Sequence, residues 1–89
     1  MDATTFEVKL DTDGYTEHEI KSYDRCSPNG EHGHHFSVSG LVLNGVFIVI
    51  RDQKPVAYGA GEVFEVAEGC LYSDEIGSTG ARVLIGRKY

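Results

Sequence analysis

Residues 31–45 read EHGHHFSVSGLVLNG and place three histidines within four positions, directly before an apolar segment. Residues two apart in a strand share one face, so His32 and His34 point together and His35 points to the opposite side. Two imidazoles on one face can hold a first-row metal ion at about 2.0–2.1 Å from each nitrogen. The alternative is two polar residues where a loop meets a strand. His35 is expected at the surface or at a subunit contact.

Outward from this segment, apolar and polar residues alternate along almost the whole chain, and no amphipathic helix is predicted. Residues 16–23 carry enough charge to favour an edge strand, because charged side chains discourage aggregation there. Asn44-Gly45 predicts a type I′ hairpin turn, since both central positions of that turn need positive φ. The other expected strands are 6–10, the histidine-bearing strand up to 43, its hairpin partner 46–50, and 56–58, 63–66, 70–72 and 82–85.

Turns are expected between these strands. Residues 24–30, DRCSPNG, are typical of a loop, and residues 51–55 and 77–80 of turns. Eleven glycines are spread over such corners. Many short strands joined by tight turns indicate a sandwich or a small barrel.

Length and charge exclude several classes of function. A chain of 89 residues favours one domain. Eight Lys and Arg against fourteen Asp and Glu give a net charge of -6, which disfavours nucleic acid and anionic membrane surfaces as partners. No apolar run is long enough to span a bilayer. The start MDATTFEV lacks the features of a signal peptide, so we expect a cytoplasmic protein. Cys26 and Cys70 are expected to be reduced there, although the sequence leaves a disulfide open.

From His32 onward the chain resembles the cupin family. The first cupin motif contains a His-x-His pair, then a glutamate, then a closing glycine. Here His32 and His34 match the pair and Gly45 matches the glycine, whereas Val38 stands at the glutamate position. This places the first motif at about residues 32–45.

The second motif falls at about residues 61–76. Gly61 and Gly69 match its glycines, whereas Ala67 replaces a proline, Tyr72 a histidine and Ile76 an asparagine. The sequence therefore lacks two of the four ligands that the family uses.

The resemblance implies an all-β fold, the cupin double-stranded β-helix or small antiparallel jelly-roll barrel, formed as a single domain by residues 1–89. It also implies a frequent homodimer and a pocket that holds a divalent metal (iron, zinc, manganese or nickel). The implied metal residues are His32, His34 and Tyr72. A tyrosine with a pKa of about 10 ligates only a strongly Lewis-acidic ion. The pocket is expected to contain Cys70, Val38, Tyr58 and Phe47.

Four further residues have two interpretations each. Cys70 shares a face with Tyr72 and is either a ligand or, by preference, a small buried hydrophobe. Asp74 and the neighbouring Glu75 are either a ligand or proton acceptor or, by preference, solvated surface. His18 either reaches the pocket or is an edge or core residue whose hydrogen bonds are satisfied.

Three functions follow. The first is a metal-binding cupin, with a small-molecule dioxygenase or isomerase as the enzyme form. The second is a metal-free module that binds a small molecule as a sensor or carrier, for which an apolar pocket with a few polar groups suffices. The third is a structural or interaction domain. Residual metal binding ranks slightly ahead of metal-free binding, and a catalysed reaction ranks below both.

Overall fold

The computed structural model describes residues 1–24, 28–33 and 35–89, and of residues 28–32 the backbone alone. Its described part contains one helix and six strands. They are α1 (Ala3–Thr12), β1 (Glu17–Tyr23), β2 (Pro28–His32), β3 (Ser37–Arg51), β4 (Lys54–Tyr58), β5 (Val63–Val66) and β6 (Tyr72–Lys88). The described residues include no helix that is long and apolar enough to cross a membrane.

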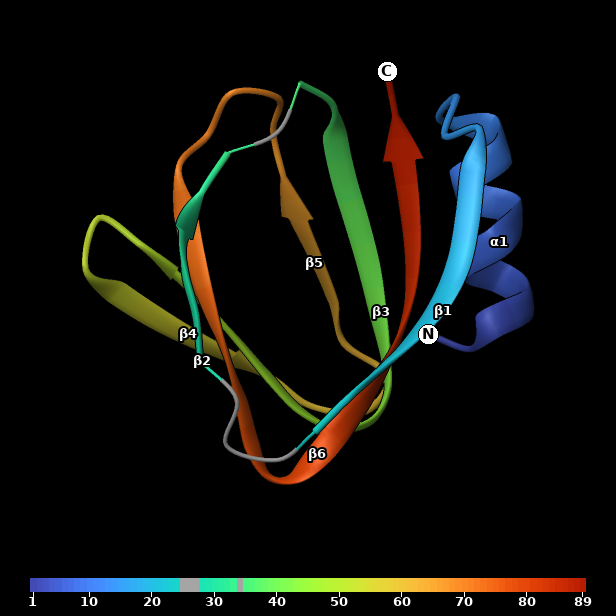
Figure 1. The fold of residues 1–89 in the computed structure, drawn as a ribbon. Helices are drawn as coiled ribbons and strands as arrows, with labels where there is room; N and C mark the ends of the chain where they lie inside the picture. Colours follow the sequence, from blue (N-terminus) through green and yellow to red (C-terminus); the bar gives the residue numbers. More distant parts are fainter. Residues whose placement is uncertain (25–27, 34) are drawn as a thin grey trace.

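The two long strands, β3 and β6, pair with each other and bend together from one layer of the barrel to the other (Figure 1). In the first layer β3 residues 37–45 pair with β6 residues 81–88, flanked by β5 and β1. In the second layer their remaining halves pair, flanked by β4 and β2. Every pairing is antiparallel. The all-β barrel expected from the sequence is confirmed.

The predicted hairpin turn at Asn44-Gly45 is wrong, because β3 runs through it to Arg51. Gly45 does have a positive φ of 77°, but it sits opposite Ala81 of β6, at a shift in strand register. A Cβ atom on Gly45 would overlap the carbonyl group of Gly80. This position is therefore a β-bulge in which two backbones approach closely, and bulges bend the strand that contains them.

The bulge also changes which residues face the barrel interior. Val38 and Val42 face inward before it, and Phe47 and Val49 face inward after it. The predicted turn at residues 77–80 is also wrong, because these residues lie within β6. The two-residue turn with positive φ is found instead at Asp52 and Gln53, between β3 and β4.

The predicted strand at residues 6–10 is wrong, because this segment belongs to helix α1. The side chain of Asp2 caps the helix by accepting a hydrogen bond from the Thr5 amide at 2.8 Å. Phe6 and Leu10, four residues apart on one helical face, are buried. Val8 is 62% exposed, whereas a half-buried strand would have buried it with the other two.

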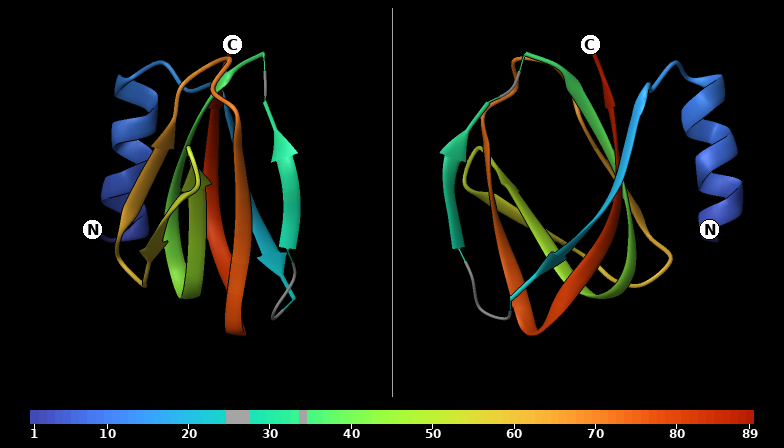
Figure 2. Two further views of the ribbon diagram at one scale, coloured as in Figure 1. Left: turned by 90° about the vertical axis from the view of Figure 1, so that its left-hand side faces the viewer. Right: turned by 45° about the vertical axis from the view of Figure 1, so that its right-hand side comes forward.

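Helix α1 covers the outer face of the layer that contains β1, β6 and β3 (Figure 2). Phe6 and Leu10 pack there against Leu41 and Leu84. A separate, larger core fills the barrel interior. The sheet is thus apolar on both sides where the helix lies.

The remaining predicted elements have mixed outcomes. The edge strand predicted at 16–23 is confirmed as β1, which among the described strands pairs with β6 alone. Strands predicted at 56–58 and 63–66 are confirmed as β4 and β5. The loop predicted at 24–30 is wrong at its end, because β2 begins at Pro28.

Candidate functional site

The predicted pocket residues line the interior of the barrel. Val38, Phe47 and Tyr72 are buried in the inner core, and Tyr58 and Cys70 are partly buried against it. Rings extend this core across the barrel, since the centroid of Phe47 lies 4.9 Å from that of Phe64 in a stacked arrangement, and 5.4 Å from that of Tyr23. Tyr58 adds a tilted contact of 5.6 Å to Phe64.

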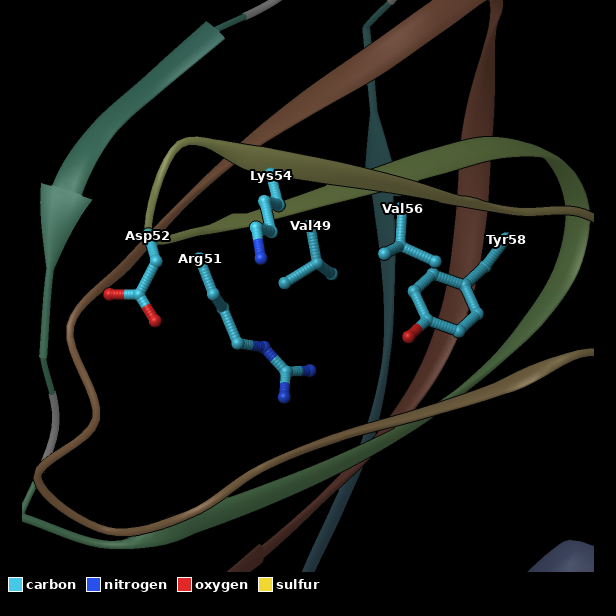
Figure 3. Close-up of a pocket in the computed structure, with 6 residues that line it drawn as sticks. All are labelled: Val49, Arg51, Asp52, Lys54, Val56 and Tyr58. Carbon is cyan, nitrogen blue, oxygen red and sulfur yellow. The ribbon is translucent and has the colours of Figure 1, made fainter.

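A cavity of about 280 Å³ opens beside this core, and we call it the β4 cavity. Pairing between β3 and β4 produces its lining, because directly opposed residues share one face of a sheet. Figure 3 shows Val49, Arg51 and Lys54 directed to the same side. The lining residues are Val49, Arg51, Asp52, Lys54, Val56 and Tyr58.

Arg51 spans the space between the two layers of the barrel. Its Nη2 donates a 2.6 Å hydrogen bond to the backbone carbonyl of Glu65 in β5. A guanidinium carries several further N–H donors in a rigid fork, and none of these is bonded within the described part of the chain. Within the described part of the chain, neither Arg51 nor Lys54 forms an ion pair with a carboxylate. The β4 cavity thus combines an apolar wall with two cationic side chains and the carboxylate of Asp52.

Asp74 is buried, so the preferred interpretation of this residue as solvated surface is wrong. It is 6% exposed and follows Tyr72 by two residues, on the inward-facing side of β6. Glu75, one residue further, is exposed as expected. The sequence signal was the alternation of Tyr72, Asp74 and Ile76, which places all three on one face.

Two tyrosines, Tyr23 and Tyr72, have raised pKa values to which burial and the charge of Asp74 contribute. Burial, with a further contribution from the negative charge of Asp74, raises the pKa of Tyr23 to about 12 and that of Tyr72 to about 12. Both phenols therefore keep their protons at neutral pH. A protonated phenol can donate a hydrogen bond, and it becomes a metal ligand only when the ion displaces its proton.

The described residues do not fit a cupin metal centre. Among them no three His, Cys, Asp or Glu side chains lie close enough together to hold a metal ion. His34 lies outside the described residues, and of His32 the backbone alone is described, paired with Tyr72. The protonated phenol of Tyr72 is a poor substitute for the missing histidine, and the thiol of Cys70 lies 3.7 Å from the Leu71 carbonyl oxygen.

The other two histidines lie outside the pocket. His18 on edge strand β1 has its Nε2 2.9 Å from the Tyr15 carbonyl oxygen and 3.6 Å from the Asp11 carboxylate. This agrees with a satisfied edge residue. His35 is exposed.

Sequence reasoning missed Arg51 and Lys54 as groups that line the cavity. It considered Asp74 as an inward acid but preferred a position at the surface. Arg51 and Lys54 were assigned to a turn, although they flank Asp52 and Gln53 as an opposed pair of strand residues. Alternation from Phe47 through Val49 would have placed Arg51 on the inward face of its strand. Lys54 then follows, because it pairs with Arg51 across a two-residue turn.

Solved cupin structures resemble this one. The cupin domain of Cnp3 from Schizosaccharomyces pombe matches with a TM-score of 0.73 and 18% identity, over 80% of this chain and 53% of that chain. KdgF from Halomonas sp. gives 0.68 at 15% identity, over 81% and 67% of the two chains. An RmlC-like cupin from Shewanella frigidimarina gives 0.67 at 21% identity, over 79% and 62%.

The chain therefore spans between about half and two thirds of the length of these three proteins. No protein-family model matches the sequence, and no curated protein matches it. At such low sequence identities the similarity establishes a shared fold, and it does not assign the ligands of those proteins to this chain. The paired bent strands, the inner core and the structural matches together show that this chain has the cupin fold.

Proposed function

We propose that this protein is a cupin-fold module that binds a small organic anion in the β4 cavity. The observation that carries the proposal is the Arg51 guanidinium, which reaches between the two layers and is held by the Glu65 carbonyl at 2.6 Å. A guanidinium fixed in this way presents its fork in one orientation. Its geometry matches the two oxygens of a carboxylate.

The rest of the lining suits a ligand with a short apolar body. Val49 and Val56 supply aliphatic surface, Tyr58 supplies a ring with a polar tip, and Lys54 adds a second positive charge. The volume of about 280 Å³ is at the low end of ligand pockets and equals roughly nine water molecules at about 30 Å³ each. A carboxylic acid of a few carbon atoms fits this description.

The test is a titration with butyrate that is monitored through amide chemical shifts in NMR spectra. Butanamide, an uncharged molecule of the same shape, is titrated in the same way for comparison. Butyrate should shift the amides of β3 and β4, and butanamide should bind at least about tenfold more weakly, as expected for loss of a charge-assisted hydrogen bond. Arg51→Met should weaken butyrate to the level of butanamide. Arg82→Met, at an exposed position of β6 outside the cavity, is the matched control and should bind as the unmodified protein does. Equal binding of both ligands, or an Arg51→Met variant that binds normally, would refute the proposal.

Metal binding is the second candidate, because the backbone of His32 pairs with Tyr72, which faces the barrel interior. His32 and His34 would then be the ligands for iron, zinc, manganese or nickel. Protein made without a histidine tag and reconstituted with each ion should hold one equivalent by mass spectrometry, and Tyr72→His should tighten the binding. Much less than one equivalent would contradict this candidate, and with it the dioxygenase and isomerase functions.

A homodimer is proposed from exposed apolar side chains on two of the edge strands. Ile20 of β1 is 54% exposed and Val56 of β4 is 51% exposed. Association would bury such surface, which benefits a small domain. A monomer mass that does not change with concentration in light scattering would contradict it. The cytoplasmic location stays a prediction.

A further inference from the structure

One face of the hairpin formed by β3 and β4 changes character in three steps along the β4 cavity. Alternate residues of a strand share a face, so alternate pairs of the hairpin follow one another on the same side of the sheet. The pairs on this side are Phe47 with Tyr58, Val49 with Val56, and Arg51 with Lys54. The face therefore runs from an aromatic pair through an aliphatic pair to two cations beside the turn. We call Arg51 and Lys54 the cationic pair.

The cationic pair is an unfavourable arrangement without an anion beside it. Directly opposed residues have Cβ atoms about 4.5–5.5 Å apart, and like charges placed in this way destabilise a strand pair. Within the described part of the chain, no carboxylate forms an ion pair with Arg51 or Lys54. The neighbouring Asp52 lines the cavity, but its carboxylate is directed away from the Arg51 guanidinium (Figure 3). Two positive charges thus lie at one end of the cavity, where a ligand can compensate them.

We infer that the ligand of the β4 cavity carries a doubly charged phosphate group on a small apolar or aromatic body, and that Lys54 sets the preference for this group over a singly charged one. This inference rests on the proposed function, because it names the class of organic anion that the same site takes. A phosphate monoester holds close to two negative charges above its second pKa of about 6. A carboxylate holds a single charge and would leave one member of the cationic pair uncompensated.

Both members of the cationic pair can bind one phosphate group. A guanidinium matches two phosphate oxygens with its fork, and a lysine ammonium binds phosphate as a point charge. The 2.6 Å hydrogen bond from Arg51 to the Glu65 carbonyl holds the guanidinium in place. Lys54 starts from the opposed position on β4, so its ammonium can reach the same group from the other strand.

The order of the three pairs determines how such a ligand lies. Side chains two residues apart on a strand are separated by about 6.8 Å along its axis. A phosphate at the cationic pair therefore places a directly attached ring over Val49 and Val56, with its far edge toward Tyr58. The Tyr58 ring is itself supported by a tilted contact of 5.6 Å with Phe64. A dicarboxylate would instead place its second charge against the aliphatic pair.

The experiment compares phenyl phosphate with phenyl sulfate at pH 8 and low salt, by NMR titration of the intact chain. The two molecules have the same shape, but the phosphate carries nearly twice the negative charge of the sulfate. We expect phenyl phosphate to bind at least about fivefold more tightly, because an added unit charge about 4 Å from a cation produces an attraction of that size even in water. Inorganic phosphate lacks the apolar body and should bind at least about tenfold more weakly than phenyl phosphate.

Variants of Lys54 test its assignment. Lys54→Met removes the second charge and should lower the preference for phenyl phosphate over phenyl sulfate by at least about threefold, whereas Lys54→Arg should keep it. Lys54 is exposed, so neither change alters the buried core. Lys21→Met, at an exposed position of β1 outside the cavity, is the matched control and should also keep the preference.

The outcomes separate this inference from the proposed function. If phenyl sulfate binds as tightly as phenyl phosphate, and both are lost in Arg51→Met, the site takes organic anions and the phosphate inference is overturned. A preference that is unchanged in Lys54→Met overturns the assignment of Lys54. Inorganic phosphate that binds as tightly as phenyl phosphate overturns the monoester class. If neither the phenyl compounds nor butyrate shift any amide, the proposed function is overturned together with the inference.

Discussion

Replacing Gly45 by alanine tests whether β3 and β6 cross between the layers as a pair of bulged strands. At this position φ is 77°, and the added Cβ would overlap the carbonyl group of Gly80 on the neighbouring strand. The left-handed conformation costs a residue with a Cβ about 1–2 kcal/mol. Forcing two backbones apart adds about 1–3 kcal/mol, as in an overpacked core. We therefore expect Gly45→Ala to lower the free energy of unfolding by about 2–5 kcal/mol.

Gly69→Ala is the matched control, because its φ is 78° but no atom lies within 4 Å of the added Cβ. It should lose only the conformational part, about 1–2 kcal/mol. Urea unfolding followed by circular dichroism gives both values, and a total stability of about 5–15 kcal/mol for a domain leaves room to measure them. If Gly45 were in an open hairpin turn, the two variants would lose the same amount. Equal losses would refute the bulge and the close approach of the two strands.

Three further predictions concern the cores and the buried tyrosines. Phe6→Ala should destabilise the protein by about 3–5 kcal/mol in urea unfolding, whereas exposed Val8→Ala should change little, and equal effects would contradict the docked helix. Ser39→Ala should raise the melting temperature, because the buried hydroxyl has no hydrogen-bond partner within the described part of the chain; a clear fall would show a missed partner. Tyr23 and Tyr72 have folded pKa values of about 12 against 10.0 in the unfolded chain, so their contribution to stability is complete below pH 10 and is lost as the pH rises toward 12. Absorbance titration of the phenolate should show this late phase, and its absence would contradict their burial.

The pattern of alternation predicted the fold class and much of the inner core correctly. Val38 and Phe47 were expected in the pocket and are buried in the barrel interior. Such predictions succeed because a half-buried strand imposes period two whatever its partners are. The same rule, extended by two residues, would have placed Arg51 and Asp74 in the interior.

Alternation failed at helix α1 because apolar residues at positions 6, 8 and 10 satisfy two patterns at once. The pair Phe6 and Leu10 fits one face of a helix as well as one face of a strand. The choice depends on the cap at Asp2 and on the apolar outer face of β3 and β6, where only the helical spacing buries both side chains. That outer face exists only after the barrel has formed.

The bulge at Gly45 separates what the sequence by itself determined from what only the tertiary structure decided. Asn44-Gly45 correctly indicated a positive φ, since that preference is a local property of glycine. A hairpin turn and a bulge share this backbone conformation and differ only in which distant residue lies opposite. The partner here is Ala81, thirty-six positions along the chain (81 minus 45), and it is held there by the pairing of β3 with β6. The tertiary structure therefore decided which side chains face the cavity, because strand register depends on contacts that no local pattern contains.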